Sequence, residues 1–92
     1  MRLIPITIAE AEKFLATHKR HYVNPGTDKI GAIGIGDSEL HGAAVLARLP
    51  SNDGWVGCIA HIYVDGSFGG YTTLYGACWR ALHAMGYEYV KL

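Results

Sequence analysis

The chain contains few charged residues, and the two signs balance. Only 17% of its 92 residues are Asp, Glu, Lys or Arg, and the formal net charge is zero. Such a surface has no broad positive field to attract a nucleic-acid backbone, so nucleic-acid binding is not expected. Half of the residues are apolar, which indicates a folded globular domain. Because so few charges solvate the surface, we expect part of it to be covered by a second copy or by another protein.

Cysteine is scarce, and long apolar runs are absent. The spacing of Cys58 and Cys78 fits no zinc motif, and both residues lie in apolar segments. This pattern predicts buried free thiols in a reducing compartment. No apolar stretch approaches the length of a membrane-spanning helix, and the N-terminus has no apolar signal core. We therefore expect a cytoplasmic protein, folded as a single domain over residues 1–92.

The N-terminal half predicts a strand, a helix and two further strands. Residues 2–6 form a short predicted strand, and Thr7 with Glu10 makes a capping-box pattern that starts a helix. The apolar face of this helix has i, i+3 and i+4 spacing and carries Ile8, Ala11, Phe14, Leu15 and His18. Residues 29–35 and 39–49 are predicted strands, and the short turn between them requires antiparallel pairing.

The C-terminal half predicts a central strand, a glycine-rich turn, a helix and a last strand. The strand over residues 55–64 is apolar on both faces, so both faces should be covered. One face is expected to carry Val56, Cys58, Ala60, Ile62 and Val64, and the other Trp55, Gly57, Ile59, His61 and Tyr63. A turn over 65–70 opens a helix over 71–85, whose buried stripe ends at Met85. Residues 87–92 are predicted to return as a parallel strand through a right-handed crossover.

This order of elements, β-α-β-β-β-α-β, predicts an α/β (α+β) domain with an antiparallel meander and a parallel final strand. A glycine-rich turn between a central strand and a helix N-terminus can hold phosphate, because the first helical N–H groups have no internal partner. Glycine also allows a ligand to approach the backbone closely. The candidate residues are Gly66, Gly69, Gly70, Tyr71 and Thr72. The alternative is a turn that needs glycine only for its backbone angles.

The run from Ile62 to Gly66, the later Gly86-Tyr87 pair and the order of elements resemble the GNAT superfamily of N-acetyltransferases. More closely, the chain resembles small GNAT-like proteins of phages and prophages. That closer resemblance rests on the stretches 2–7, 18–21 and 74–81. It implies acetyl-CoA bound at the turn, with the backbone around Ile62, Tyr63 and Val64 orienting the acyl group.

The sequence departs from the GNAT pattern at two points. Gly66 stands where the family has a basic or amide residue, and Tyr71 stands where it has a small one. Superfamily members also continue with further strands and a helix that shape the acceptor site. The resemblance therefore implies either a dimer that completes the site or a domain that no longer catalyses. If catalysis is present, the candidate proton carriers are His61, Tyr63 and Asp65, although His61 also suits a structural role within a strand.

Two groups of residues are candidates for binding a substrate or partner. His18 and His21 lie three apart at a helix end, and without an evident third ligand they predict no metal site. Tyr71, Tyr75 and Trp79 form a second apolar stripe on the later helix, which serves either a wide core contact or an interface. The resemblance to small phage proteins implies an alternative function, that of a non-catalytic phage-type protein in the host cytoplasm. It would bind and inhibit a host defence protein through this helix face and the last strand.

Overall fold

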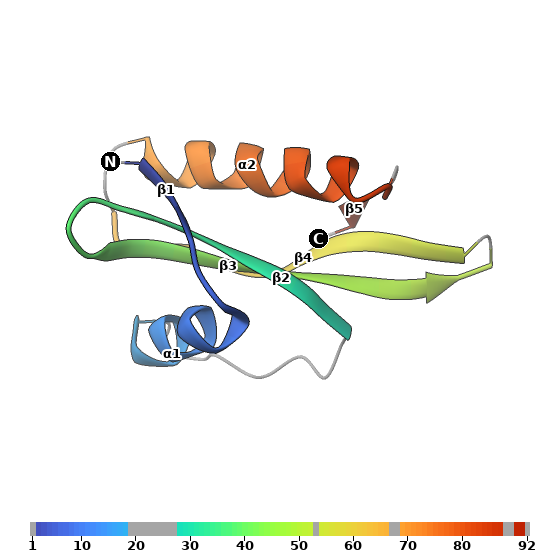
Figure 1. Ribbon diagram of the computed structural model, residues 1–92, viewed down its shortest axis with the longest axis horizontal. Coiled ribbons are helices and arrows are strands. Elements are labelled where there is room, and N and C mark those ends of the chain that lie inside the picture. Colours follow the sequence, from blue (N-terminus) through green and yellow to red (C-terminus); the bar gives the residue numbers. More distant parts are fainter. Residues whose placement is uncertain (1, 19–27, 53, 67–68, 88–89, 92) are drawn as a thin grey trace.

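The computed structural model describes residues 2–18, 28–52, 54–66, 69–87 and 90–91, and Figure 1 shows their arrangement. The elements follow in the order β1 (Arg2–Pro5), α1 (Ile8–His18), β2 (Asp28–Gly36), β3 (Leu40–Ser51), β4 (Gly54–Val64), α2 (Gly70–Ala84) and β5 (Val90–Lys91). Strands β1 to β4 pair consecutively and antiparallel in one sheet. The predicted α+β class and antiparallel meander are confirmed.

Strand β5 is the shortest element of the sheet. It lies beside β4 through two parallel pairs, Gly57 with Val90 and Cys58 with Lys91. Two pairs do not establish the full parallel strand predicted over 87–92, and that strand stays a prediction. Beyond these pairs, no described strand adjoins the outer edge of β4.

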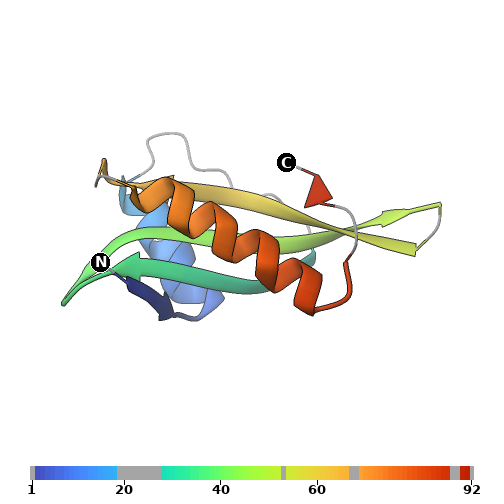
Figure 2. The same ribbon diagram turned by 90° about the horizontal axis from the view of Figure 1, so that it is seen from above.

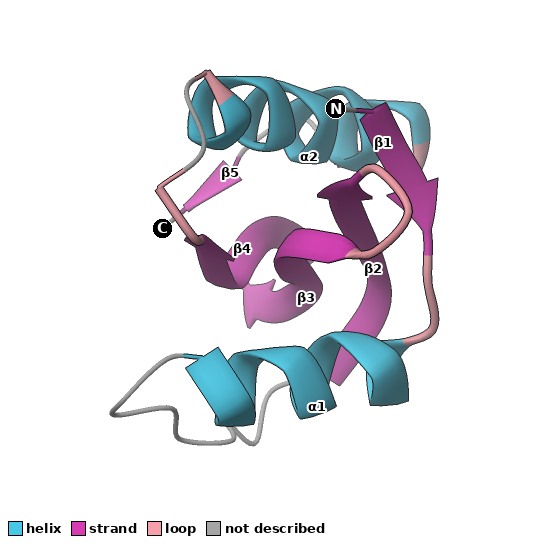
Figure 3. Cartoon of the chain, turned by 90° about the vertical axis from the view of Figure 1, so that its left-hand side faces the viewer, coloured by secondary structure: helices cyan, strands magenta, loops and turns pink. Residues whose placement is uncertain are grey.

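The two helices cover opposite faces of the sheet, as Figures 1 and 3 show. On the α2 face the core consists of Ile35, Ala44, Leu46, Ile59, Leu74, Cys78 and Leu82. On the α1 face it consists of Ala11, Phe14, Leu15, Ala43 and Val45. Strand β3 contributes alternate residues to both clusters, as a strand buried on both sides must. Seen from above, α2 runs obliquely across the strands (Figure 2).

The start of α1 confirms the predicted capping box. The Thr7 backbone N–H donates to Glu10 Oε1 at 3.0 Å, and the Glu10 N–H donates to Thr7 Oγ1 at 3.1 Å. Both contacts satisfy donors that the first helical turn would otherwise leave open. Hydrogen bonding from Thr7 to the Glu10 carboxylate, first from its backbone N–H and then from its side chain, lowers the pKa of Glu10.

The predicted strict alternation along β4 is wrong, because β4 contains a β-bulge. Val45 pairs with His61 and Leu46 pairs with Ile59, so Ala60 is an extra residue on β4. Beyond the bulge, odd-numbered and even-numbered residues of β4 change faces. Ile59 and Ile62 therefore both pack on the α2 face, whereas Ala60 and Tyr63 pack on the α1 face. A bulge places two residues opposite one and thereby shifts the period-2 pattern by one position.

The end of α2 also differs from its prediction at one residue. The helix ends at Ala84, and Met85 is its C-cap, 46% exposed rather than part of the buried stripe. Gly86 has a φ of 96°, and the Tyr87 N–H donates to the Leu82 carbonyl at 3.0 Å. This is the glycine C-terminal stop that the sequence predicts.

Both cysteines are buried free thiols, as predicted. Burial raises the pKa of Cys78 to about 11, so its thiol stays protonated at neutral pH. In the described part of the chain, neither helix has the length and apolar character needed to cross a membrane.

Candidate functional site

Among the residues that the structure describes, no side chain caps the N-terminus of α2 where it follows β4. Gly69 has a left-handed φ of 75°, and α2 begins at Gly70 with no side-chain cap and no acidic residue in its first turn. The Thr73 N–H donates to the Gly69 carbonyl at 3.1 Å, which is the first turn of the helix. The preceding amides therefore face outward at the positive end of the helix dipole.

The glycines at this junction leave open space around the backbone. Its chain neighbours aside, a Cβ atom added to Gly66, at φ 96°, or to Gly69 would meet no atom of the described residues within 4 Å. Gly70 is buried, whereas Tyr71 and Thr72 are exposed. The Tyr71 ring stacks with that of Tyr75, one helical turn further on, with 6.2 Å between the ring centres. The junction thus combines free backbone approach with outward-facing donors.

The outer edge of β4 leads directly to this junction. Strand β5 pairs with β4 only at Gly57 and Cys58, so among the described residues no strand pairs with this edge from Ile59 to Val64. The bulge at Ala60 lies at the start of this open stretch. An unpaired strand edge presents backbone donors and acceptors that can bind another extended chain. Ile62 and Val64 pack on the α2 face beside it.

The predicted proton carriers His61, Tyr63 and Asp65 lie along and just after the end of β4. His61 pairs with Val45 and Tyr63 pairs with Ala43. Because both partners belong to the α1-face core, and directly paired residues share a face, His61 and Tyr63 are on the α1 face. The Tyr63 ring lies 6.3 Å from that of Phe14 and 6.4 Å from that of His18.

Asp65 instead pairs with His41, which the sequence does not place among the candidate proton carriers. His41 Nδ1 lies 2.7 Å from Asp65 Oδ2, and the Asp65 N–H donates to the His41 carbonyl at 2.9 Å. A second bulge makes this possible: Ile35 pairs with Gly42 and Gly36 with Leu40, which leaves His41 as the extra residue of β3. Bulges commonly redirect a side chain in this way.

The hydrogen bond that His41 donates to the Asp65 carboxylate raises the pKa of His41, and the charges of Asp65, Asp37 and Glu39 raise it further. Because the folded-state pKa lies above the ordinary value of 6.5, this pair stabilises the fold fully below about pH 6.5 and loses that contribution as the pH rises through the raised value.

We expect urea unfolding to show that the stability of the fold falls between mildly acidic and mildly alkaline pH. Asp65→Asn should reduce this slope, and an unchanged slope in that variant would contradict the assignment.

The candidate partner-binding residues fall into two places. His21 lies outside the described residues, whereas His18 ends α1 and stacks on Phe14 with 4.2 Å between ring centres. On α2, Tyr71 and Trp79 are 51% and 41% exposed, while Tyr75 packs against the core. The predicted stripe is therefore part core contact and part exposed surface. The stripe continues to His83, whose ring meets that of Trp79 edge-on with 4.4 Å between the ring centres.

Among the described residues, no three His, Cys, Asp or Glu side chains gather as a metal site.

Comparison with known proteins adds no assignment: no family model, curated protein or solved structure matches this chain.

Proposed function

We propose that this chain is a minimal GNAT-like N-acyltransferase domain that binds acetyl-CoA along the open edge of β4 and at the start of α2. The observation that carries this proposal is the continuity of the two features. In the described part of the chain, no strand adjoins the outer side of β4 from Ile59 to Val64, and this stretch leads to a glycine junction and to a helix N-terminus without a side-chain cap. The antiparallel meander with helices on opposite faces accords with the GNAT resemblance of the sequence.

The residues at the junction suit the chemistry of acetyl-CoA. Its long arm contains amide groups, which can pair with the backbone of an open strand edge in the manner of an added strand. Its pyrophosphate suits the outward N–H groups of Gly70, Tyr71 and Thr72, with Gly66 and Gly69 giving free approach. When bound, acetyl-CoA would supply the acyl group: an amide bond to the acceptor amine forms, the thioester C–S bond breaks, and CoA leaves as a thiolate that takes up a proton.

The chain's own side chains then have to remove a proton from the acceptor amine. His61 adjoins the bulge on the open stretch of β4, and Tyr63 lies two residues further on the same face. We assign the base role to His61, since histidine is the side chain most often used for proton transfer. The His41–Asp65 pair at the end of β4 is a second proton-carrying group. The acceptor site would be completed by a second copy of the chain, so the active form is a homodimer.

Binding of acetyl-CoA tests the proposal directly. Calorimetry should show binding by the native chain, and Gly69→Arg should abolish it, because the new side chain occupies the approach to the α2 amides. Gly54→Arg is the matched control: Gly54 also has a positive φ, of 119°, and open surroundings, but it lies on the β3–β4 hairpin. Absence of binding by the native chain, or an equal loss in both variants, would overturn the proposal.

A second function is favoured by the exposed part of the α2 stripe. Tyr71 and Trp79 are large side chains that remain about half exposed, and Tyr and Trp are enriched in binding hot spots. With the open β4 edge, they form a surface on which another protein could dock. In this alternative the chain is a non-catalytic inhibitor of a host protein and does not bind acetyl-CoA, so the same calorimetry separates the two functions.

A further inference from the structure

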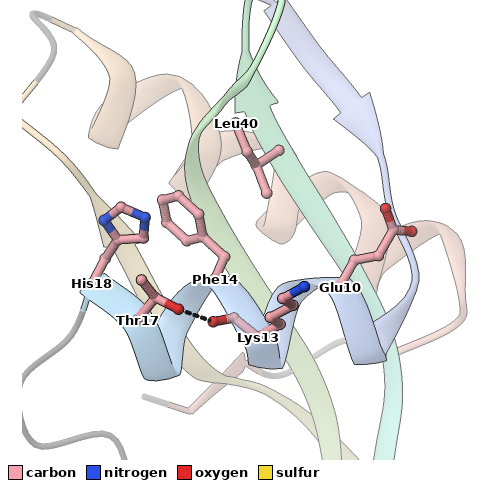
Figure 4. Close-up of a pocket in the computed structure, with 6 residues that line it drawn as sticks. All are labelled: Glu10, Lys13, Phe14, Thr17, His18 and Leu40. Atoms are coloured by element: carbon pink, nitrogen blue, oxygen red, sulfur yellow. Dashed lines mark hydrogen bonds between the residues drawn. The ribbon is translucent and has the colours of Figure 1, made fainter.

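A pocket lies on the α1 side of the molecule, away from the α2 junction. Its volume is about 380 Å³, and it is an open depression, since four of its six lining residues are exposed. Figure 4 shows its lining, in which five residues come from α1 and one from the start of β3: Glu10, Lys13, Phe14, Thr17, His18 and Leu40. The aromatic rings of Phe14 and His18 stack together, and Leu40 projects from the sheet above them.

The two charged groups of this pocket are separate from each other. The Glu10 carboxylate accepts from the Thr7 N–H through Oε1 at 3.0 Å and also from the Thr7 side chain. Each carboxylate oxygen has two lone pairs, so Oε2 can still accept from a further donor. Within the described part of the chain, the Lys13 ammonium joins no ion pair. The Thr17 hydroxyl donates to the Lys13 carbonyl at 2.9 Å, so it can still accept but not donate. The pocket thus presents one anion, one cation and an apolar floor.

We propose that this pocket binds small zwitterionic molecules with an apolar body, of the amino-acid class. The ammonium of such a ligand suits Glu10 Oε2, and its carboxylate suits Lys13. Its apolar body suits Phe14, His18 and Leu40. A simple anion would meet the repulsion of Glu10, and a simple cation that of Lys13, so opposite charges on one molecule fit best. This proposal does not depend on acyl transfer and is tested without acetyl-CoA.

The test uses three probes that share one apolar side chain and differ in their charged groups: L-phenylalanine, its amide, which lacks the carboxylate, and its N-acetyl derivative, which lacks the ammonium. NMR titration of the whole native chain should show L-phenylalanine shifting the α1 amides. The two derivatives should bind about tenfold more weakly, because each loses a charge-assisted hydrogen bond. No binding of L-phenylalanine, or equal binding of all three, would overturn the proposal.

Two variants locate the binding. Lys13→Gln should weaken the binding of L-phenylalanine about tenfold and leave the binding of its amide unchanged. Glu10→Gln should weaken the binding of L-phenylalanine by a similar factor and leave the binding of its N-acetyl derivative unchanged. Glu10→Gln keeps a carbonyl oxygen for the Thr7 N–H, so the helix cap is preserved. Glu12→Gln is the control, because Glu12 is on the same helix but pairs with Lys29 at 2.6 Å outside the pocket lining. A loss equal to that of Lys13→Gln in the control would place the binding elsewhere.

Discussion

Replacing His61 by alanine is expected to lower the rate of acyl transfer by about 10²–10⁴-fold, the usual contribution of a positioned general base. His61 follows directly after the bulge residue Ala60, at the beginning of the stretch of β4 that no described strand covers. Its side chain lies on the α1 face, opposite Val45. Affinity for acetyl-CoA should be unchanged, because the binding groups we assign are backbone amides. Steady-state rates and calorimetry on the same preparation measure both quantities.

His83→Ala is the matched control for this experiment. It also removes an imidazole, but His83 is exposed on α2, where its ring contacts Trp79. The control should keep the native rate. If His61→Ala also keeps it while acetyl-CoA still binds, His61 is not the base, and the His41–Asp65 pair becomes the group to test. If His61→Ala loses acetyl-CoA binding, the residue has a structural role in β4 rather than a chemical one.

The local signals in the sequence predict most of the fold. The Thr7–Glu10 capping box and the Gly86 stop depend on residues within a few positions of one another, so their geometry is encoded locally. The meander follows because a short turn permits only antiparallel pairing. The bulges at His41 and Ala60 could not be predicted, since an extra residue on one strand is defined only by its partner strand.

Part of the candidate site is likewise encoded in one short stretch of sequence, and part depends on how strands pair. The open glycine junction was predicted, because glycine and a following helix are visible in one stretch of sequence. The His41–Asp65 contact joins residues 24 apart, and it depends on the register of β3 against β4. Counting forward along the chain from the tight turn after Gly36 places His41 near the start of β3, which lies opposite the end of β4. The charged pocket could not be predicted by such counting, because it forms only where Leu40 of β3 lies beside α1, and these two elements are far apart in the sequence.

Leu74→Ala is expected to reduce the free energy of unfolding by about 2–5 kcal/mol, through lost burial and the cavity left behind. Leu74 is 0% exposed and packs in the core beneath the first turns of α2. Since small domains are stable by only about 5–15 kcal/mol, this one change removes a large part of the total. It should also loosen the start of α2 and weaken acetyl-CoA binding before global unfolding.

Leu3→Ala provides the comparison, because Leu3 is 40% exposed on the edge strand β1 and its loss opens no core cavity. Urea unfolding of both variants should show a large shift for Leu74→Ala and a shift of about 1 kcal/mol or less for Leu3→Ala. Equal shifts would mean that α2 is not held to the sheet through Leu74. The backbone amides at its N-terminus would then lack the rigid support that a phosphate site requires.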